Sequence, residues 1–370
     1  MHIVLLGNTA RGVLNFWRVL VENLHAEGHR VSVFVPKGDA DDDAAVLAMG
    51  VDLHHYPLDR KGLNPVCDMV TLTALYRLFR RERPDMLFCY TIKPVIYGCL
   101  AARFAGVRRR FAAITGLGYM FEADSPIKKI LTVLAALLYR LALFGAAAIF
   151  FQNREDKEVF EKTRIVTPAH RVELTRGTGV NIVHFAPAPL PSGSPVFLLV
   201  GRLLEAKGLY EYADAARMLK VRHPGIRFQL LGPPEQGRGS VPLEKVLEWK
   251  QEGIVEYLGQ TGDVRPYIAA ASVLVLPSWR EGTPCSIMEG MSMGRPVVVT
   301  DAPGCREVVC NGINGYMVSP RDARALAEAL ERFIQHPENI ASMGAASRKI
   351  AVEEFDARKT AAHIMRVMDL

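Results

Sequence analysis

Short apolar runs alternate with longer stretches of helical periodicity along the whole chain. The runs that predict strands in the first half are 2–6, 30–36, 86–90, 110–115 and 147–151. Those in the second half are 196–200, 227–231, 255–258, 272–276, 296–300 and 315–318. Because these runs lack polar alternation and are separated by helical segments, they indicate parallel sheets buried on both faces. The sequence therefore predicts an α/β fold of the doubly wound type.

The alternation pauses once, in a stretch rich in proline, serine and glycine (FAPAPLPSGSP). This composition predicts a linker at 186–195, between Rossmann-like domains at 1–185 and 196–352. Two such domains leave a cleft at the carboxyl ends of both sheets, where doubly wound sheets bind ligands. Residues 353–370 predict a helix that packs beyond its own domain, back on the N-terminal one.

One apolar segment, 127–151, is nearly long enough to span a membrane. Arg140 lies in its middle, which disfavours insertion by roughly 2.5–3.5 kcal/mol. We therefore expect a buried or interfacial helix from Ile127 to Phe144, ended by Gly145, and then a strand.

The net charge of +6 lies entirely in residues 1–185, while residues 186–370 are neutral. This asymmetry indicates an anionic partner for the N-terminal half, or alternatively a solvated basic face. The six cysteines form no C-x-x-C pair and no metal-ligand spacing, so we expect free thiols in a reducing cytosol. No signal peptide is expected. Basic residues without interleaved aromatic residues or a helix-turn-helix pattern argue against nucleic-acid binding.

The turn after the first predicted strand runs from Gly7 to Gly12. It is not G-x-G-x-x-G, and it lacks the Lys-Ser/Thr of a P-loop, so a dehydrogenase and a P-loop NTPase are both disfavoured. Arg11, Asn15 and Arg18 lie on the first turns of the helix that follows. This helix start is a candidate anion site, although a plain tight turn with solvated arginines explains it as well.

Two further motifs lie in the second half. Arg202 and Lys207 stand at a strand-to-helix turn, where paired cations suit a diphosphate, although such residues are often merely solvated. Glu281 lies in the loop after strand 272–276, and Glu289 lies about one turn into the next helix. Carboxylates at these positions can accept hydrogen bonds from vicinal hydroxyls of a nucleotide sugar.

These motifs resemble glycosyltransferase family 4. The resemblance rests on G-R-x-x-x-x-K-G at 201–208, E-G-x-P-x-S-x-x-E at 281–289 and D-A-P-G-C-R-E-V-V at 301–309, and it covers essentially the whole chain. It implies the GT-B fold, two Rossmann-like domains that face each other across a cleft. It also implies transfer with retention of anomeric configuration and without an essential metal or cofactor.

The resemblance also implies roles for individual residues. Arg202 and Lys207 would bind the donor diphosphate, Glu281 would contact the sugar near the reacting carbon, and Glu289 would hold the ribose. Backbone groups of the donor loop would support the sugar and phosphates. The residues implied there are Gly282, Thr283, Pro284, Cys285 and Ser286, and we add Gly7 of the first turn to the donor site.

The N-terminal half is similar to transferases that add an N-acetylhexosamine to undecaprenyl-diphosphate-linked sugars, among them the bacillosamine-accepting N-acetylgalactosaminyltransferases. The similarity lies in Leu63-Asn64-Pro65, in T-I-K-P at 91–94 and in T-G-L-G-Y at 115–119. It implies a polyprenyl-diphosphate-linked glycan as acceptor and a peripheral position on the inner face of the cell membrane. Where many family members have a histidine in the first-domain loop, this chain has Gly116-Leu117-Gly118, so we expect backbone contacts there. The acceptor-binding residues expected are Arg11, Asn15, Lys93, Gly116 and Gly118.

The sequence thus predicts a hexosyltransferase that takes an N-acetylhexosamine from a UDP-sugar, a substrate rather than a cofactor. UDP-GalNAc is the first choice of donor, and UDP-GlcNAc or another UDP-hexose is the alternative. A GT-B-like sugar-nucleotide epimerase or phosphorylase is the main rival, and a non-catalytic nucleotide-sugar-binding protein is a further one.

Overall fold

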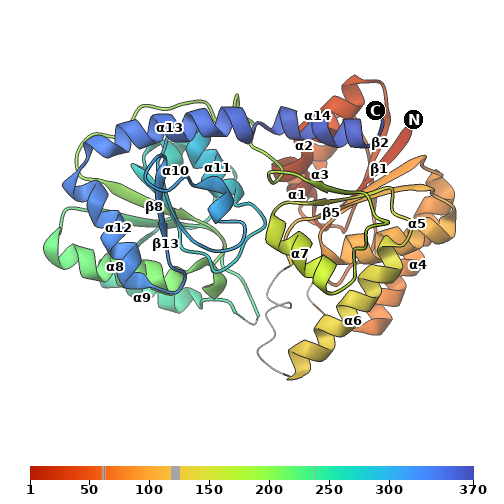
Figure 1. Ribbon diagram of the computed structural model, residues 1–370, viewed down its shortest axis with the longest axis horizontal. Helices are drawn as coiled ribbons and strands as arrows, with labels where there is room; N and C mark the ends of the chain where they lie inside the picture. The colour runs from red at the N-terminus through yellow and green to blue at the C-terminus, as the bar shows by residue number, and fades with distance from the viewer. Residues whose placement is uncertain (61, 63, 118–125, 238) are drawn as a thin grey trace. The chain divides into compact units, whose positions relative to one another are not determined.

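The computed structural model describes residues 1–60, 62, 64–117, 126–237 and 239–370. The chain divides into two compact units, which are Met1–Thr178 with Ala357–Leu370, and Gly179–Asp356. Each unit is built on one sheet whose strands all pair in parallel (Figure 1). The predicted doubly wound α/β fold is confirmed.

The first unit contains a seven-stranded sheet with the order β3-β2-β1-β4-β5-β6-β7. Its strands are β1 (His2–Leu6), β2 (Arg30–Val35), β3 (Asp52–His55), β4 (Met86–Tyr90), β5 (Arg109–Ile114), β6 (Ala148–Phe151) and β7 (Val172–Leu174). The sequence pattern had indicated neither β3 nor β7. Both are short edge strands that pair with a single neighbour and contain half-exposed polar residues.

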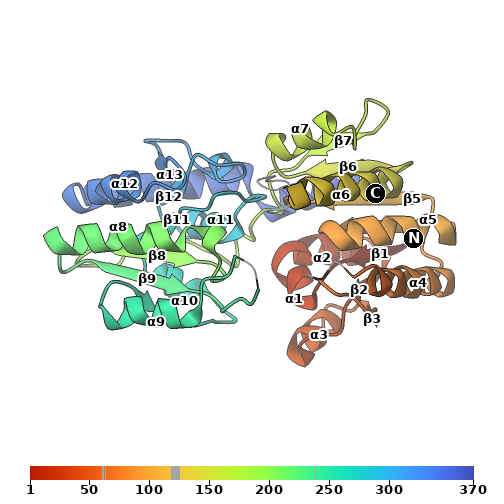
Figure 2. The same cartoon turned by 90° about the horizontal axis from the view of Figure 1, so that it is seen from below.

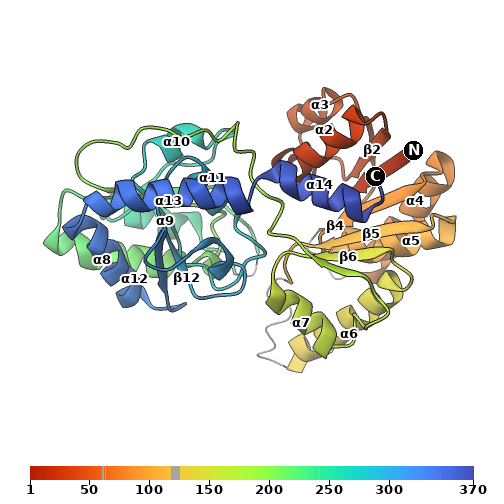
Figure 3. The ribbon, with the colours of Figure 1, turned by 45° about the horizontal axis from the view of Figure 1, so that its top comes forward.

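Side chains of β1 alternate between two cores, one on each face of this sheet. Val4 and Leu6 enter the core under α4 (Pro65–Glu82), α5 (Cys99–Ala105), α6 (Pro126–Leu143) and α7 (Arg154–Lys162). Ile3 and Leu5 enter the opposite core, under α2 (Arg18–Ala26), α3 (Ala40–Leu47) and α14 (Ala357–Val367). Helices α4 and α5 lie side by side on their face (Figure 2), and α14 lies along α2 on the other (Figure 3). The remaining helical turns of the unit are α1 (Ala10–Gly12), η1 (Val13–Trp17) and η2 (Pro94–Gly98).

The second unit contains a six-stranded sheet with the order β10-β9-β8-β11-β12-β13. Its strands are β8 (Val196–Val200), β9 (Arg227–Leu231), β10 (Glu256–Tyr257), β11 (Val273–Leu276), β12 (Val297–Thr300) and β13 (Gly315–Val318). One face packs on α8 (Leu209–Arg222), α9 (Leu243–Gln251) and α12 (Ala323–Gln335). The other packs on α10 (Arg265–Ala269), α11 (Cys285–Ser292) and α13 (Glu338–Glu354). Single turns η4 (Glu205–Lys207) and η5 (Arg306–Val308) follow β8 and β12.

The second unit begins before the proline-rich stretch because two arginines fix the residues that lead into it. Arg348 donates to the carbonyls of Ile182 and Phe185. Arg295, which is fully buried, donates to those of Ala188 and Pro189 at 2.8 and 2.7 Å. Part of the expected linker is therefore packed against the second unit. At the C-terminus, the segment expected as one helix from residue 353 instead contains the end of α13 and, from Ala357, the separate helix α14.

Arg295 is a buried cation whose hydrogen-bond partners are all backbone carbonyls. Besides Ala188 and Pro189, it donates to Ile268 and Ala269 at the end of α10 and to Met293 at the end of α11. The carboxyl ends of helices carry partial negative charge and unpaired carbonyls, so they favour a guanidinium.

We expect Arg295→Met to lower the free energy of unfolding by about 3 kcal/mol or more, because it leaves several buried carbonyls without donors. Urea unfolding monitored by circular dichroism measures this change. Arg324→Met is the matched control, because Arg324 is 85% exposed and bonds only Glu328 on its own helix. Its effect should stay below about 0.5 kcal/mol, and equal losses in the two variants would contradict the role of Arg295.

Candidate functional site

Arg202 and Lys207 lie in the loop that follows β8, at the carboxyl end of the second sheet. Lys207 ends η4, and Gly208 after it adopts a left-handed conformation with φ of 74°. A Cβ atom at Gly208 would lie 2.1 Å from the carbonyl oxygen of Pro277, so only glycine permits this approach. The close contact brings Lys207 against the loop that follows β11.

Side chains from these two loops are bonded to Glu281. Its Oε1 accepts a hydrogen bond from Lys207 Nζ at 2.5 Å and another from Ser278 Oγ at 2.6 Å. Ser278 is completely buried, and the backbone N–H of Glu281 donates to the carbonyl of Pro303. Two residues selected separately from the sequence, Lys207 and Glu281, are thus bonded to each other, and Ser278, which sequence reasoning did not select, holds the same carboxylate oxygen.

The loop after β12 is the third loop of this site, and it contacts the loop after β11. Gly304 has φ of 79°, and a Cβ atom there would lie 2.2 Å from the carbonyl oxygen of Gly282. Thr300 donates its hydroxyl to the carbonyl of Ser278. Burial raises the pKa of Cys305 in the same loop to about 12, so its thiol stays protonated and unreactive near neutral pH. Three loops are thus fixed around one carboxylate.

Arg202 is not bonded to the same group as Lys207. Its guanidinium forms an ion pair of 2.7 Å with Glu235, in the loop after β9, and remains about half exposed. Sequence reasoning missed Glu235, although its position just after the predicted strand 227–231 was a signal. Lys207 is the more enclosed cation, with 20% of its side chain exposed.

The donor loop leads into α11. Thr283 and Pro284 are buried, whereas Gly282, Cys285 and Ser286 are partly exposed. Pro284 is the N-cap, and no side chain caps this helix start. The first turn of α11 therefore presents its positive dipole end beside the predicted donor loop.

Glu289 lies one turn into α11 and is partly buried. Burial raises the pKa of its carboxyl to about 8, and no cation or hydrogen-bond donor among the described residues reaches this carboxyl group. At pH 7 most of these carboxyls are protonated, so each can donate one hydrogen bond and accept others. Glu281 and Glu289 are thus placed in different electrostatic environments.

The raised pKa predicts a pH-dependent stability. Between about pH 4.5 and pH 8 the folded chain keeps a proton on Glu289 that the unfolded chain loses, so the free energy of unfolding falls as pH rises. We expect Glu289→Gln to remove roughly 1–3 kcal/mol of this fall, because glutamine has no charge to desolvate. Urea unfolding at pH 5, 7 and 9 measures it. Glu328→Gln on an exposed helix face is the control, and an identical pH slope in wild type and Glu289→Gln would refute the assignment.

Gly7 directly follows β1 in the first unit, and its backbone groups are bonded within the protein. Its N–H donates to Phe34, and its carbonyl accepts from Tyr56 Oη at 2.8 Å. A Cβ atom on Gly7 would lie 2.1 Å from Tyr90 Oη, so the residue must be small. The structure thus gives Gly7 a clear packing role.

The predicted acceptor residues differ in how available they are. Arg11 forms an ion pair of 2.7 Å with Asp42, and Lys93 bonds Asp68 at 2.6 Å and the carbonyl of Gly62 at 2.8 Å. Asn15 is exposed on η1, and Gly116 follows β5 with φ of 121°. Gly118 lies outside the described residues, as do Leu63 and Tyr119 of the motifs. Arg11 and Lys93 are therefore already neutralised by carboxylates of their own unit.

All six cysteines are free thiols. Within the described ranges, no group of three or more histidine, cysteine, aspartate or glutamate side chains is arranged to hold a metal ion. Nor does any helix in this part of the chain have the length and apolar character needed to cross a membrane.

Comparison with known families agrees with this architecture. The model of the glycosyl transferase 4-like family matches residues 2–153, and that of glycosyl transferases group 1 matches residues 194–336. The two matches fall on the two structural units and together cover most of the chain.

Among curated proteins, the N,N'-diacetylbacillosaminyl-diphospho-undecaprenol alpha-1,3-N-acetylgalactosaminyltransferase of Campylobacter jejuni is 25% identical over 348 residues, 90% of each chain. The UDP-Gal:alpha-D-GlcNAc-diphosphoundecaprenol alpha-1,3-galactosyltransferase of Escherichia coli is 27% identical over 289 residues, 74% of this chain and 72% of that one.

Among solved structures, sucrose-phosphate synthase of Thermosynechococcus elongatus superposes with a TM-score of 0.81 at 20% identity, over 100% of this chain and 98% of that one. HepE of Anabaena, in complex with UDP-glucose, superposes with a TM-score of 0.79 at 18% identity, over 100% and 99%. The fold is therefore GT-B, and the chain belongs to glycosyltransferase family 4.

Proposed function

We propose that this glycosyltransferase moves an N-acetylhexosamine, GalNAc as the first choice, from a UDP-sugar to a polyprenyl-diphosphate-linked sugar, with retention of configuration. The observation that carries the proposal is the cluster of Lys207, Glu281 and Ser278 at the carboxyl end of the second sheet. The relatives from Campylobacter jejuni and Escherichia coli, which are transferases for diphospho-undecaprenol-linked sugars, supply the acceptor class. Their different sugars leave UDP-GlcNAc and other UDP-hexoses as alternatives for the donor.

In this proposal, Lys207 and Arg202 bind the donor diphosphate. Negative charge grows on the diphosphate as the sugar departs, so the two cations stabilise the transition state more than the ground state. Lys207 already lies against Glu281, which holds the ammonium in place. The donor phosphate can accept the proton of the acceptor hydroxyl, so a front-face reaction needs neither a protein base nor a metal ion.

The remaining donor contacts follow from α11. The start of this helix, with Gly282 to Ser286 before and within its first turn, would support the sugar and phosphates, and Glu289 would bond the ribose hydroxyls. A partly buried, largely protonated carboxyl can donate to one hydroxyl and accept from the other. Gly7 would act indirectly, by fixing the turn after β1.

We further propose that the first unit docks on the inner face of the cell membrane through α6. This helix exposes five large aliphatic side chains by 50–70% each, and Phe144 just after it by 63%. The five are Ile130, Val133, Leu134, Leu137 and Leu141. A helix with such an apolar face lies well at a lipid interface.

Charge favours an anionic lipid surface as the occupant of this face. The helix contains no acidic residue, and the exposed Arg140 lies near its end. The guanidinium of Arg103 stacks on the ring of Phe144, 4.7 Å from its centroid. Cations next to exposed apolar side chains match the phosphates and acyl chains of a bilayer surface.

A transfer assay with a panel of UDP-sugars and a short-chain prenyl-diphosphate-linked sugar tests the reaction. We expect product with UDP-GalNAc, unchanged by a metal chelator and with the donor's anomeric configuration. Lys207→Ala should lower kcat/KM by roughly 100-fold or more and Arg202→Ala by roughly 10-fold or more, because each removes a cation from the leaving group.

Lys250→Ala, a change on an exposed position of α9, is the control and should keep the wild-type rate. Near-normal turnover in Lys207→Ala and Arg202→Ala would refute their assignment. A modified sugar nucleotide formed without any acceptor would identify an epimerase instead.

Membrane docking is tested by sedimentation with vesicles that contain phosphatidylglycerol. We expect Val133→Glu with Leu137→Glu to weaken binding by at least about tenfold, because it places two charges where apolar side chains meet the lipid. Val221→Glu is the matched control, since Val221 is 84% exposed on α8 of the second unit. Equal binding by all three proteins would exclude α6 as the contact.

A further inference from the structure

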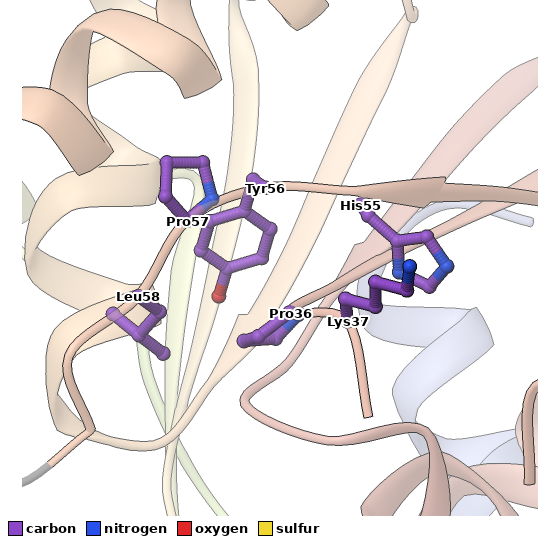
Figure 4. Close-up of a pocket in the computed structure, with 6 residues that line it drawn as sticks. All are labelled: Pro36, Lys37, His55, Tyr56, Pro57 and Leu58. Atoms are coloured by element: carbon purple, nitrogen blue, oxygen red, sulfur yellow. The ribbon is translucent and has the colours of Figure 1, made fainter. Parts of the chain in front are cut away.

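A pocket of about 350 Å³ opens at the carboxyl end of the first sheet, where β2 and β3 end. None of the residues that line it was given a role by the sequence analysis. It is lined by the two residues that follow β2, by the last residue of β3 and by the three residues after it. They are Pro36, Lys37, His55, Tyr56, Pro57 and Leu58 (Figure 4).

The walls of this pocket are fixed from three directions. Tyr56 is 3% exposed, and its hydroxyl donates to Gly7, which places the pocket directly beside the turn after β1. Thr71 of α4 donates its hydroxyl to the carbonyl of Pro57 at 2.8 Å. The imidazole Nδ1 of His55 lies 3.3 Å from the carbonyl of Val35. The pocket is therefore a formed feature of the sheet edge.

The two ends of the pocket differ in chemistry. Tyr56, Pro57, Leu58 and Pro36 form an apolar end, whereas Lys37 and His55 lie together at the other end (Figure 4). Apolar and aromatic surfaces suit the C–H face of a pyranose ring, and an ammonium suits a phosphate. A hexose that carries a phosphate at its anomeric position has both an apolar face and an anionic group.

Lys37 is the available cation in the lining of this pocket. Its side chain is exposed, and within the described part of the chain no hydrogen bond or ion pair involves its ammonium. Arg11 and Lys93, by contrast, are paired with Asp42 and Asp68. Among the residues that line this pocket, Lys37 is therefore the cation that an anionic acceptor can engage without breaking an existing pair.

Negative charge beside the pocket limits where the phosphate can lie. His55 Nε2 is 3.2 Å from Asp43, and the first turn of α3 also contains Asp41 and Asp42. These carboxylates repel an anion on the α3 side, although Arg11 neutralises Asp42. Because Asp43 already occupies His55, a phosphate in this pocket would have to meet the Lys37 ammonium, and a sugar would face Tyr56 and Leu58.

We propose that this pocket binds the sugar and adjoining phosphate of the diphosphate-linked acceptor. The inference rests on the proposed transfer reaction, and it replaces Arg11 and Lys93 by Lys37 as the cation that meets the acceptor. A donor phosphate offers similar chemistry, so the experiment must separate acceptor from donor.

Steady-state transfer by the full-length chain makes this separation. We expect Lys37→Ala to raise the acceptor KM by about 5- to 10-fold, the loss expected for one partly exposed charge-assisted contact, while the donor KM stays within about twofold. Lys37→Arg should restore most of the affinity. The effect of Lys37→Ala should shrink at high salt, because an exposed charge is screened.

The sugar end is tested by inhibition with two soluble probes, a glycosyl diphosphate and a prenyl diphosphate without sugar. Leu58→Ala should weaken inhibition by the glycosyl diphosphate by about threefold and leave that by the sugar-free probe unchanged. Lys162→Ala, which removes a lysine 76% exposed on α7, is the control for charge.

The outcomes separate the two proposals. An acceptor KM within twofold of wild type in Lys37→Ala, or a rise in the donor KM instead, overturns the pocket assignment while the transfer reaction stands. Absence of transfer by the wild-type chain with every donor and acceptor overturns the proposed function itself. In that case, loss of glycosyl-diphosphate binding in Lys37→Ala, measured by calorimetry, still supports the pocket.

Discussion

Parallel pairing is the constraint from which the other features of both units follow. A parallel strand must be followed by a crossover on one face of the sheet, so every strand in a unit ends at the same edge. Gly7, Lys37 and Tyr56 follow or adjoin the ends of β1, β2 and β3 in the first unit. In the second unit, Gly201 follows β8 and Pro277 follows β11. The chemistry of each unit therefore gathers at the carboxyl edge of its sheet, although its residues are far apart in sequence.

At the edge of the second sheet, close backbone contacts fix the loops relative to one another and so define a site. Glycines at 208 and 304 let the loops after β8 and β12 touch the loop after β11, at distances that a side chain would prevent. Glu281 then bonds both Lys207 and Ser278 through one oxygen. An ammonium held in this way is positioned before a ligand arrives, so less ordering remains to be done on binding. The ion pair is thus as much a positioning device as a source of stability.

The sequence allowed the apolar strands to be predicted well. The bounds predicted for β1, β4, β8, β9 and β13 agree with the structure, because buried parallel strands are short runs of apolar residues. The edge strand β3 has the sequence DLHH, and β7 has VEL. An edge strand has one bonded neighbour and an exposed side, so its composition resembles that of a loop. Local pattern therefore identified the central strands of both sheets and the edge strands β10 and β13, and missed the two polar edge strands of the first sheet.

The candidate site shows the same division between local and long-range information. Glu281, Glu289 and Lys207 could be selected because a glycine, a proline and a helix start accompany them in sequence. That Arg11 is paired depends on Asp42, which is 31 residues away, and the pairing of Lys93 depends on Asp68, 25 residues away. No spacing in a single sequence reports such pairs, since they arise from the order of strands in the sheet. The same holds for Lys37, whose availability is visible only once the neighbouring charges have been placed.

Glu281 and Glu289 are the same type of residue, but their surroundings give their carboxyl groups different properties. Both belong to one motif and flank the start of α11, yet one is bonded to an ammonium and the other is partly buried, with no cation from the described residues beside it. A carboxylate paired with Lys207 keeps the local charge near zero and leaves the ammonium oriented. A carboxyl that holds its proton adds no negative charge beside a diphosphate, whose own charge would oppose it. In the proposed donor complex, the motif would therefore place two acidic residues near an anionic ligand at little electrostatic cost, because the fold compensates one charge and suppresses the other.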